Sequence, residues 1–244
     1  MMYLKRSAVT KVANILTPSN KPLISNSFGL PAGTDYSCPG ATRVCEGICY
    51  ANKLAKLRPS VRQLLLHNWE TLQKCGDDVD KIGNLLAAII IDFERECDRY
   101  SAPKKFRIHW DGDFYSVAYT EAWKRVIQAH PDTQFWVYTR SDFAVPILYG
   151  IPNLALYYST DEANRSSAFG LRARYPDLLL AFLGLTFEAG KNEMLDTFGT
   201  SGTFCPENNK ALPLVSDKGS ACGICQLCPT GKKDVLFSIK KGKK

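Results

Sequence analysis

The middle of the chain alternates between short apolar runs and longer segments in which apolar residues recur every three to four positions. Short runs of this kind predict strands, and the longer periodic segments predict helices. We expect strands at 106–110, 134–138, 153–158 and 178–185. Between them we expect helices at about 117–129 and 162–174 and a short helix at 143–149.

Two longer helices are predicted upstream, at about 59–74 and 78–100. In the second, apolar residues stand at helical spacing after an aspartate that suits the N-cap position; they are Ile82, Leu85, Leu86, Ile89 and Phe93. Residues 18–40 are rich in proline and glycine and predict a loop.

Strands that alternate with helices indicate a parallel sheet with right-handed crossovers. The predicted strands are almost continuously apolar, which is typical of a sheet covered on both faces. We therefore predict an α/β fold, a partial (β/α) barrel of the TIM-like kind, formed by a single domain over residues 1–244.

Polar and ionisable residues follow each predicted strand. Asp111 and Asp113 flank Gly112 after the first strand, Arg140 follows the second, and Asp161 follows the third. The carboxyl ends of parallel strands are where ligands bind in such folds. We take these four residues as candidate catalytic residues, with a tight turn, a structural salt bridge or a helix N-cap as the alternatives.

Nine cysteines distinguish this 244-residue chain, whose length suffices for a sizeable core without cross-links. The first twenty residues lack an apolar signal-type stretch, and the longest apolar run, 85–91, is too short to cross a bilayer. We expect a cytoplasmic protein with no membrane association. Cysteines in a reducing compartment are more often metal ligands than disulfides.

The first cysteine group is Cys38, Cys45 and Cys49, within twelve residues that also contain Pro39 and Gly40. A [4Fe–4S] cluster held by three thiolates keeps one iron open for a substrate or cofactor, whereas a structural site normally has four ligands. We predict that these three residues bind such a cluster.

The second group is Cys222, Cys225 and Cys228-Pro229, with Cys205 seventeen residues upstream as the natural fourth ligand. Closely spaced cysteines that end in Cys-Pro are typical of iron–sulfur ligation, and four sulfurs also suit zinc. We favour a second [4Fe–4S] cluster, with zinc as the alternative. Cys75 and Cys97 stand alone and are expected to be structural.

These groups divide the chain into a Cys-rich metal-binding loop at 25–55, the barrel core at 56–190, a second Cys-rich metal-binding segment at 200–232 and a basic tail at 233–244. The net charge is +7, and cations crowd the last thirteen residues; they are Lys232, Lys233, Lys240, Lys241, Lys243 and Lys244. Clustered ammonium groups favour contact with nucleic-acid phosphates, and a solvated tail is the alternative.

The chain contains the stretch from Phe28 to Gly33, Cys38-Pro39, Cys49-Tyr50-Ala51, Gly112-Asp113-Phe114, Tyr138-Thr139-Arg140-Ser141 and the closing cysteines. Over about residues 25–240, this set of motifs resembles a family of uncharacterised actinobacteriophage proteins. That resemblance implies the cytoplasm of an infected host cell.

The three N-terminal cysteines also resemble those of radical S-adenosylmethionine enzymes, which are partial (β/α) barrels. The resemblance implies a radical-SAM-like fold, S-adenosylmethionine on the open iron, and an auxiliary cluster at the C-terminal group. The stretch Phe106–Phe114 (FRIHWDGDF) is similar to a strand of tRNA-guanine transglycosylases. That likeness implies base exchange on DNA, with Asp111 or Asp113 as acid/base, Asp161 as nucleophile, and zinc.

Three hypotheses follow. The first is an iron–sulfur enzyme that acts on nucleic acid or a nucleotide. The second is a non-enzymatic iron–sulfur protein that binds DNA through the basic tail, and the third is a zinc-containing base-exchange enzyme. The sequence gives no prediction of the oligomeric state.

Overall fold

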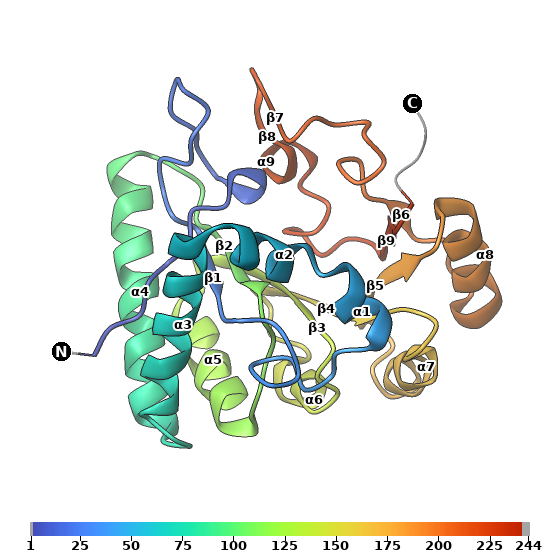
Figure 1. The fold of residues 1–244 in the computed structure, drawn as a ribbon, viewed down its shortest axis with the longest axis horizontal. Helices are drawn as coiled ribbons and strands as arrows, with labels where there is room; N and C mark the ends of the chain where they lie inside the picture. Colours follow the sequence, from blue (N-terminus) through green and yellow to red (C-terminus); the bar gives the residue numbers. More distant parts are fainter. Residues whose placement is uncertain (1, 241–244) are drawn as a thin grey trace.

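A seven-stranded parallel sheet runs through the computed structural model, which describes residues 2–240 (Figure 1). The strand order is β1-β2-β3-β4-β5-β9-β6, with β1 and β6 at the edges. The bounds are β1 Ser27–Gly29, β2 Lys105–Asp111, β3 Gln134–Thr139, β4 Leu154–Thr160, β5 Leu179–Gly184, β9 Val235–Ser238 and β6 Thr203–Phe204. A small antiparallel pair, β7 Val215–Ser216 and β8 Gly219–Ser220, stands apart.

Helices provide the connections between strands. They are α1 Arg43–Ile48, α2 Tyr50–Leu57, α3 Pro59–Gln73, α4 Val79–Arg99, α5 Val117–Ala129, α6 Ala144–Leu148, α7 Arg165–Arg174, α8 Phe187–Phe198 and α9 Ala221–Cys225, after a 3-10 turn, η1, at Thr10–Val12. None of the helices within residues 2–240 is long and apolar enough to cross a membrane.

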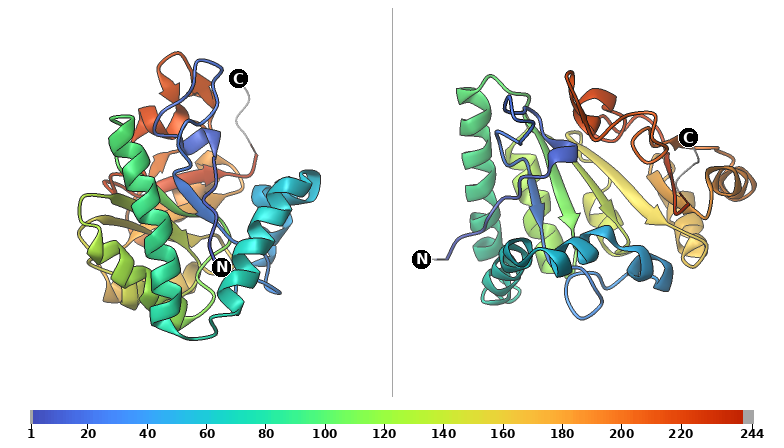
Figure 2. Two further views of the ribbon diagram at one scale, coloured as in Figure 1. Left: turned by 90° about the vertical axis from the view of Figure 1, so that its left-hand side faces the viewer. Right: turned by 45° about the horizontal axis from the view of Figure 1, so that its top comes forward.

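The two faces of the sheet have different partners because successive strand residues point to opposite sides. Phe135 and Val137 belong to the main apolar core with residues of α4, α5, α6, α7 and α8. Trp136, between them, belongs to a second core that includes Val12, Cys205 and Cys228. Figure 2 shows the N-terminal and C-terminal segments on the side away from α5 and α6. Both cysteine segments therefore lie over one face.

The α/β class and the parallel sheet are confirmed. Strands β2 to β5 and helices α3 to α7 lie within a few residues of their predicted positions, because their burial imposes a regular apolar pattern. The apolar pattern did not predict α1, α2, α8, α9 or the short strands β1, β6, β7, β8 and β9. These strands are two to four residues long, which is too short to show a period.

Strand β9 corrects the extent of the predicted basic tail. Residues 233–244 were expected to be a charged tail, yet Val235 and Leu236 are fully buried, and β9 lies between β5 and β6. The apolar run Val235-Leu236-Phe237 explains its place in the sheet. Lys240 is the last described residue, and Lys241, Lys243 and Lys244 lie outside the described residues.

Candidate functional site

A cavity of about 410 Å³ opens at the carboxyl ends of β2, β3 and β4. Its lining includes all three N-terminal cysteines and three of the four predicted catalytic residues; they are Cys38, Cys45, Cys49, Asp111, Asp113 and Arg140. A volume of this size lies in the range of small-molecule sites. Segments that are far apart in the sequence thus meet at the edge of the sheet where ligands bind in parallel α/β folds.

An irregularity in β2 shapes the floor of this cavity. Ser27 pairs with Arg107 and Gly29 with Asp111, so two residues farther along β1 correspond to four along β2. Within the bulge His109 has a φ of 55°, a left-handed conformation that is costly for histidine. Bulges re-aim side chains next to functional sites; here the bulge contains His109 and Trp110 and ends at Asp111, and all three line the cavity.

His109 is anchored on the helix side of the sheet. Its Nε2 lies 2.8 Å from the hydroxyl of Tyr119 in α5. Burial lowers the pKa of His109 to about 3, so the ring is neutral at physiological pH. Its Nδ1 is buried without a hydrogen-bond partner among the described residues.

The two strand-end aspartates have different environments. Asp113 accepts hydrogen bonds from Thr139 Oγ1 at 2.6 Å and from the backbone N–H groups of Phe114 and Arg140, each at 2.7 Å. Asp111 accepts one, from Gly112 N at 2.9 Å, and its other oxygen is buried with no partner within residues 2–240. Burial raises the pKa of Asp113 to about 6 and that of Asp111 to about 7. Asp111 is therefore the carboxyl group better placed to exchange a proton near neutral pH.

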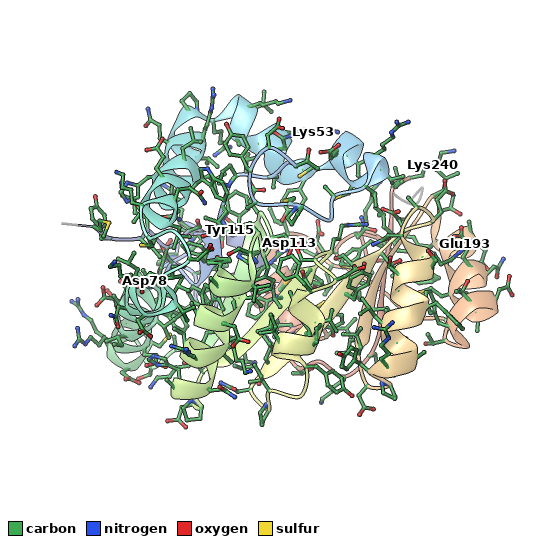
Figure 3. All side chains as sticks on the ribbon, turned by 90° about the horizontal axis from the view of Figure 1, so that it is seen from below. Lys53, Asp78, Asp113, Tyr115, Glu193 and Lys240 are labelled. Atoms are coloured by element: carbon green, nitrogen blue, oxygen red, sulfur yellow. The ribbon has the colours of Figure 1, made fainter. Side chains whose placement is uncertain are left out.

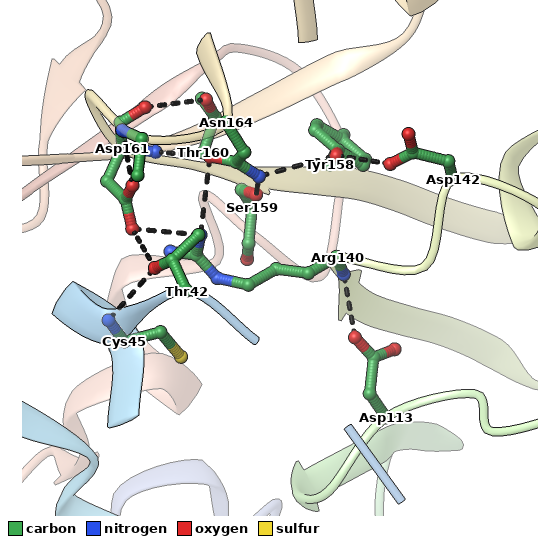
Figure 4. A network of polar contacts seen from close by, with 11 residues as sticks. Thr42, Cys45, Asp113, Arg140, Asp142, Tyr158, Ser159, Thr160, Asp161 and Asn164 are labelled. Carbon is green, nitrogen blue, oxygen red and sulfur yellow. Dashed lines mark hydrogen bonds and ion pairs between the residues drawn. The ribbon is translucent and has the colours of Figure 1, made fainter. Parts of the chain in front are cut away.

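Arg140 and Asp161 connect the cysteine loop to the sheet (Figure 4). The Arg140 guanidinium forms a buried ion pair of 2.9 Å with Asp161, which also accepts a hydrogen bond of 2.7 Å from Thr42 Oγ1. Thr42 is the N-cap of α1 and accepts from Cys45 N at 3.0 Å. Asp161 does not line the cavity, and its second oxygen accepts from Ala163 N. Its geometry is that of a tether, and a nucleophilic role remains a prediction.

The loop that carries Cys38 packs so closely on the strand ends that glycine is needed at two contacts. A Cβ on Gly40 would lie 2.1 Å from the carbonyl oxygen of Arg140. Gly112 has a φ of +81°, and a Cβ there would lie 2.5 Å from Ser37 Oγ. The Cys38 loop and the Asp111–Asp113 turn are thus held in direct contact.

The C-terminal cysteines also come together. Cys205, Cys222, Cys225 and Cys228 line one small cavity beside Pro206 and Pro229. Burial raises the pKa of Cys222 to about 11 and that of Cys228 to about 12, while the positive charges of Lys11 and Arg107 act to lower that of Cys222. Without a metal the thiols of Cys222 and Cys228 are protonated at neutral pH, so a metal that binds them must release protons.

Arg107 and Tyr138 lie between the two cysteine groups, and the sequence pattern had pointed only to Tyr138. Both line the larger cavity, and the Arg107 guanidinium lies over the Tyr138 ring at 5.2 Å from its centroid. Tyr138 also packs against the core that contains Cys228. A charged residue inside an apolar strand was the available signal for Arg107.

Within the described residues, no group of three or more His, Cys, Asp or Glu side chains is arranged closely enough to hold a single metal ion. Cys75 and Cys97 are buried and line neither cavity. Seven of the nine cysteines thus line two cavities, four in one and three in the other.

The fold and site define an α/β protein with a parallel sheet and a cysteine-lined cavity at its carboxyl edge. The family model described as Gene product 88 matches residues 2–231, and the chain belongs to this family. It is 45% identical over 247 residues to the Gene 88 protein of Mycobacterium phage L5 and 43% identical over 248 residues to that of Mycobacterium phage D29. Each alignment covers 99% of this chain and 100% of the relative. No solved structure matches the chain.

The predicted resemblance to an uncharacterised actinobacteriophage family is confirmed by these matches. The names of these relatives describe no function.

Proposed function

We propose that the protein is an iron–sulfur enzyme that acts on nucleic acid or a nucleotide, with a [4Fe–4S] cluster held by Cys38, Cys45 and Cys49. One observation carries this proposal. Cys38 in a loop, Cys45 in α1 and Cys49 between α1 and α2 line the same ligand-sized cavity as the strand-end residues Asp111, Asp113 and Arg140. Thiols, carboxyls and a guanidinium are thereby combined in one site.

The donor set suits a cluster with an open iron. A [4Fe–4S] cluster spreads its ligands over four iron atoms, so three thiolates leave one iron for an external ligand. Arg140 and Lys53 lie where their charges oppose the negative charge of Cys45 and Cys49, respectively. In this proposal S-adenosylmethionine is the ligand of the open iron, as in radical-SAM-like enzymes.

The order of the strands supports a partial barrel. From β1 to β5 each strand pairs with the next one along the chain, and all of these pairs are parallel. The helices that connect β2 to β5 contribute to one core on one face of the sheet. In a (β/α) barrel, too, the crossover helices lie outside and the opposite face forms the interior.

The C-terminal cysteines are proposed to hold a second metal centre, either another [4Fe–4S] cluster or zinc. Four sulfurs line one cavity, which is the number of protein ligands that either centre takes, and the side chains would have to move closer together to hold a single ion. Lys11 and Arg107 place two positive charges near Cys222, which would stabilise its thiolate form.

Anaerobic purification followed by iron, sulfide and zinc analysis tests this proposal. We expect a brown protein with about four irons per cluster. The variant C45A should lose the iron of the N-terminal cluster, whereas C75A, which removes a buried thiol outside both cavities, should retain it. A colourless wild-type protein that contains only zinc would contradict the proposal. If the enzyme is radical-SAM-like, S-adenosylmethionine should also alter the EPR spectrum of the reduced cluster.

A zinc-containing base-exchange enzyme is the second candidate, and the environment of Asp111 favours it. This carboxyl has a free buried oxygen and a pKa raised by burial to about 7, which suits a general acid/base. D111N should then abolish exchange of a guanine analogue into DNA. If D111N exchanges the base as fast as the wild type, this candidate fails.

A further inference from the structure

We propose that a single-stranded nucleic acid docks across α1, α2 and the start of α3, with one base stacked on Tyr50 at the cavity mouth. This inference deepens the proposed function, because it names the substrate class and the surface that binds it. It also places the nucleic-acid contact on helices α1 to α3 in place of the C-terminal tail.

The surface has a strong excess of positive charge. Between residues 43 and 62 there are five cations and one carboxylate, Glu46, and all six are exposed; the cations are Arg43, Lys53, Lys56, Arg58 and Arg62. In the part of the chain that the structure describes, none of these cations has an ion-pair partner. Unpaired surface cations on successive helices suit the phosphates of a nucleic acid, because binding releases the counterions of those phosphates.

Helix geometry keeps these charges outward. Ala51 is buried, and it shares a small core with Leu54 and Trp110 of β2. Lys53 and Lys56 are three residues apart on α2 and therefore neighbours on its surface. Figure 3 shows Lys53 on α2 at the periphery of the molecule, while Asp113 lies inside.

The same surface reaches the cavity mouth. Tyr50, at the first position of α2, lines the cavity and is 57% exposed. Its hydroxyl donates a hydrogen bond of 3.1 Å to the carbonyl oxygen of Trp110, which fixes the ring. Lys53 is near enough to Cys49 to act on its pKa. An exposed, fixed aromatic ring beside cations is the arrangement that binds single strands, because bases stack on the ring while the backbone follows the charge.

A chain on these cations would present one nucleotide to the cavity, which contains Asp111 and the three cysteines. Duplex DNA keeps its bases stacked inside and cannot offer one to Tyr50 without unpairing. The surface therefore selects single strands over duplexes.

Fluorescence anisotropy with a fluorescein-labelled single-stranded oligothymidine tests the proposal on the full-length protein. We expect K53Q/K56Q/R58Q to weaken binding at least 10-fold and to reduce the slope of log K against log salt by about two. The matched variant K21Q/R174Q/K218Q removes three exposed cations elsewhere and should bind like the wild type. We expect Y50A to weaken binding about 10-fold and Y50F, which keeps the ring, to retain it.

The outcomes separate this surface from its rivals. Equal losses in the two triple variants, tighter binding to a duplex, or capture only by vesicles containing phosphatidylserine would overturn the proposal. Loss of binding on truncation after Ser238, with the triple variant unaffected, would assign the contact to the tail instead. Iron content is measured on the same samples. A wild-type protein without iron that still binds through Lys53, Lys56 and Arg58 would overturn the iron–sulfur function and leave this surface intact.

Discussion

At the residue scale, His109 has an unfavourable backbone conformation that the residues around it hold in place. Its left-handed backbone costs of the order of 1–3 kcal/mol. The conformation is held by the hydrogen bond to Tyr119 and by the rings of Phe28, Phe114 and Trp123 around it. The result is a bulge in β2 between Arg107 and Asp111. The strained backbone of His109 therefore lies in the part of the strand that borders the cavity.

His109 also makes the fold sensitive to acid. Its pKa is about 3 in the folded chain, because burial disfavours the charged ring, against 6.5 when unfolded. As the pH falls from about 6.5 to 3, the unfolded chain binds a proton that the folded chain does not, so stability is lost. Above pH 6.5 this residue has no such effect.

We therefore expect H109N to lose less stability than the wild type between pH 7 and pH 4.5, by a few kcal/mol. Asparagine tolerates the left-handed conformation and has no charge to gain. Urea unfolding of the metal-free proteins at several pH values measures the effect. Identical pH dependence of the two proteins would contradict the assignment.

At the scale of elements, the cysteine loop is held against the strand ends by close backbone contact and by a buried ion pair. Gly40 makes the contact with Arg140, and Asp161 links Arg140 to the N-cap of α1. The positions of Cys38 and Cys45 thus depend on β3 and β4, although these strands are about a hundred residues away in sequence.

Two glycine variants test this dependence. G40A should destabilise the protein by about 1–3 kcal/mol and lower its iron content, because the new methyl group would clash with the rigid Arg140 carbonyl. G47A, inside α1, meets nothing within 4 Å and should be neutral or stabilising by up to about 1 kcal/mol. Urea unfolding with iron analysis distinguishes them. Equal effects of the two variants would show that the close contact at Gly40 is unimportant.

At the scale of the whole molecule, the sheet separates a conventional core from a layer that contains the two cysteine groups. The helix side carries most of the large buried side chains and needs no cofactor. The opposite side is covered by the two cysteine segments, which have only short helices and strands. Metal binding would contribute folding free energy mainly to that second layer.

Removal of the proposed metal should therefore loosen one side of the protein only. After treatment with an iron and zinc chelator, we expect amide hydrogen exchange to rise at least 10-fold in residues 38–50 and 205–230. Exchange in β3 and β4 should stay unchanged. Mass spectrometry of peptic fragments measures both regions together, and a uniform rise across the chain would argue against two separable layers.

The α/β class, strands β2 to β5 and most of the helices could be predicted from local patterns, because buried strands and helices impose a local apolar period. The sequence also indicated the cysteines and the strand-end polar residues, since their chemistry is visible in single residues. Short strands such as β9 left no such period.

Which of these residues share a site became visible from the folded chain alone. It placed Asp111 in the cavity and Asp161 behind it, and it set Arg107 and Tyr138 between the two cysteine groups. It also placed Tyr50 and the cations of α2 at the mouth. These relations depend on strand order and on a bulge at His109, which are set by contacts between segments far apart in the chain and not by any local pattern.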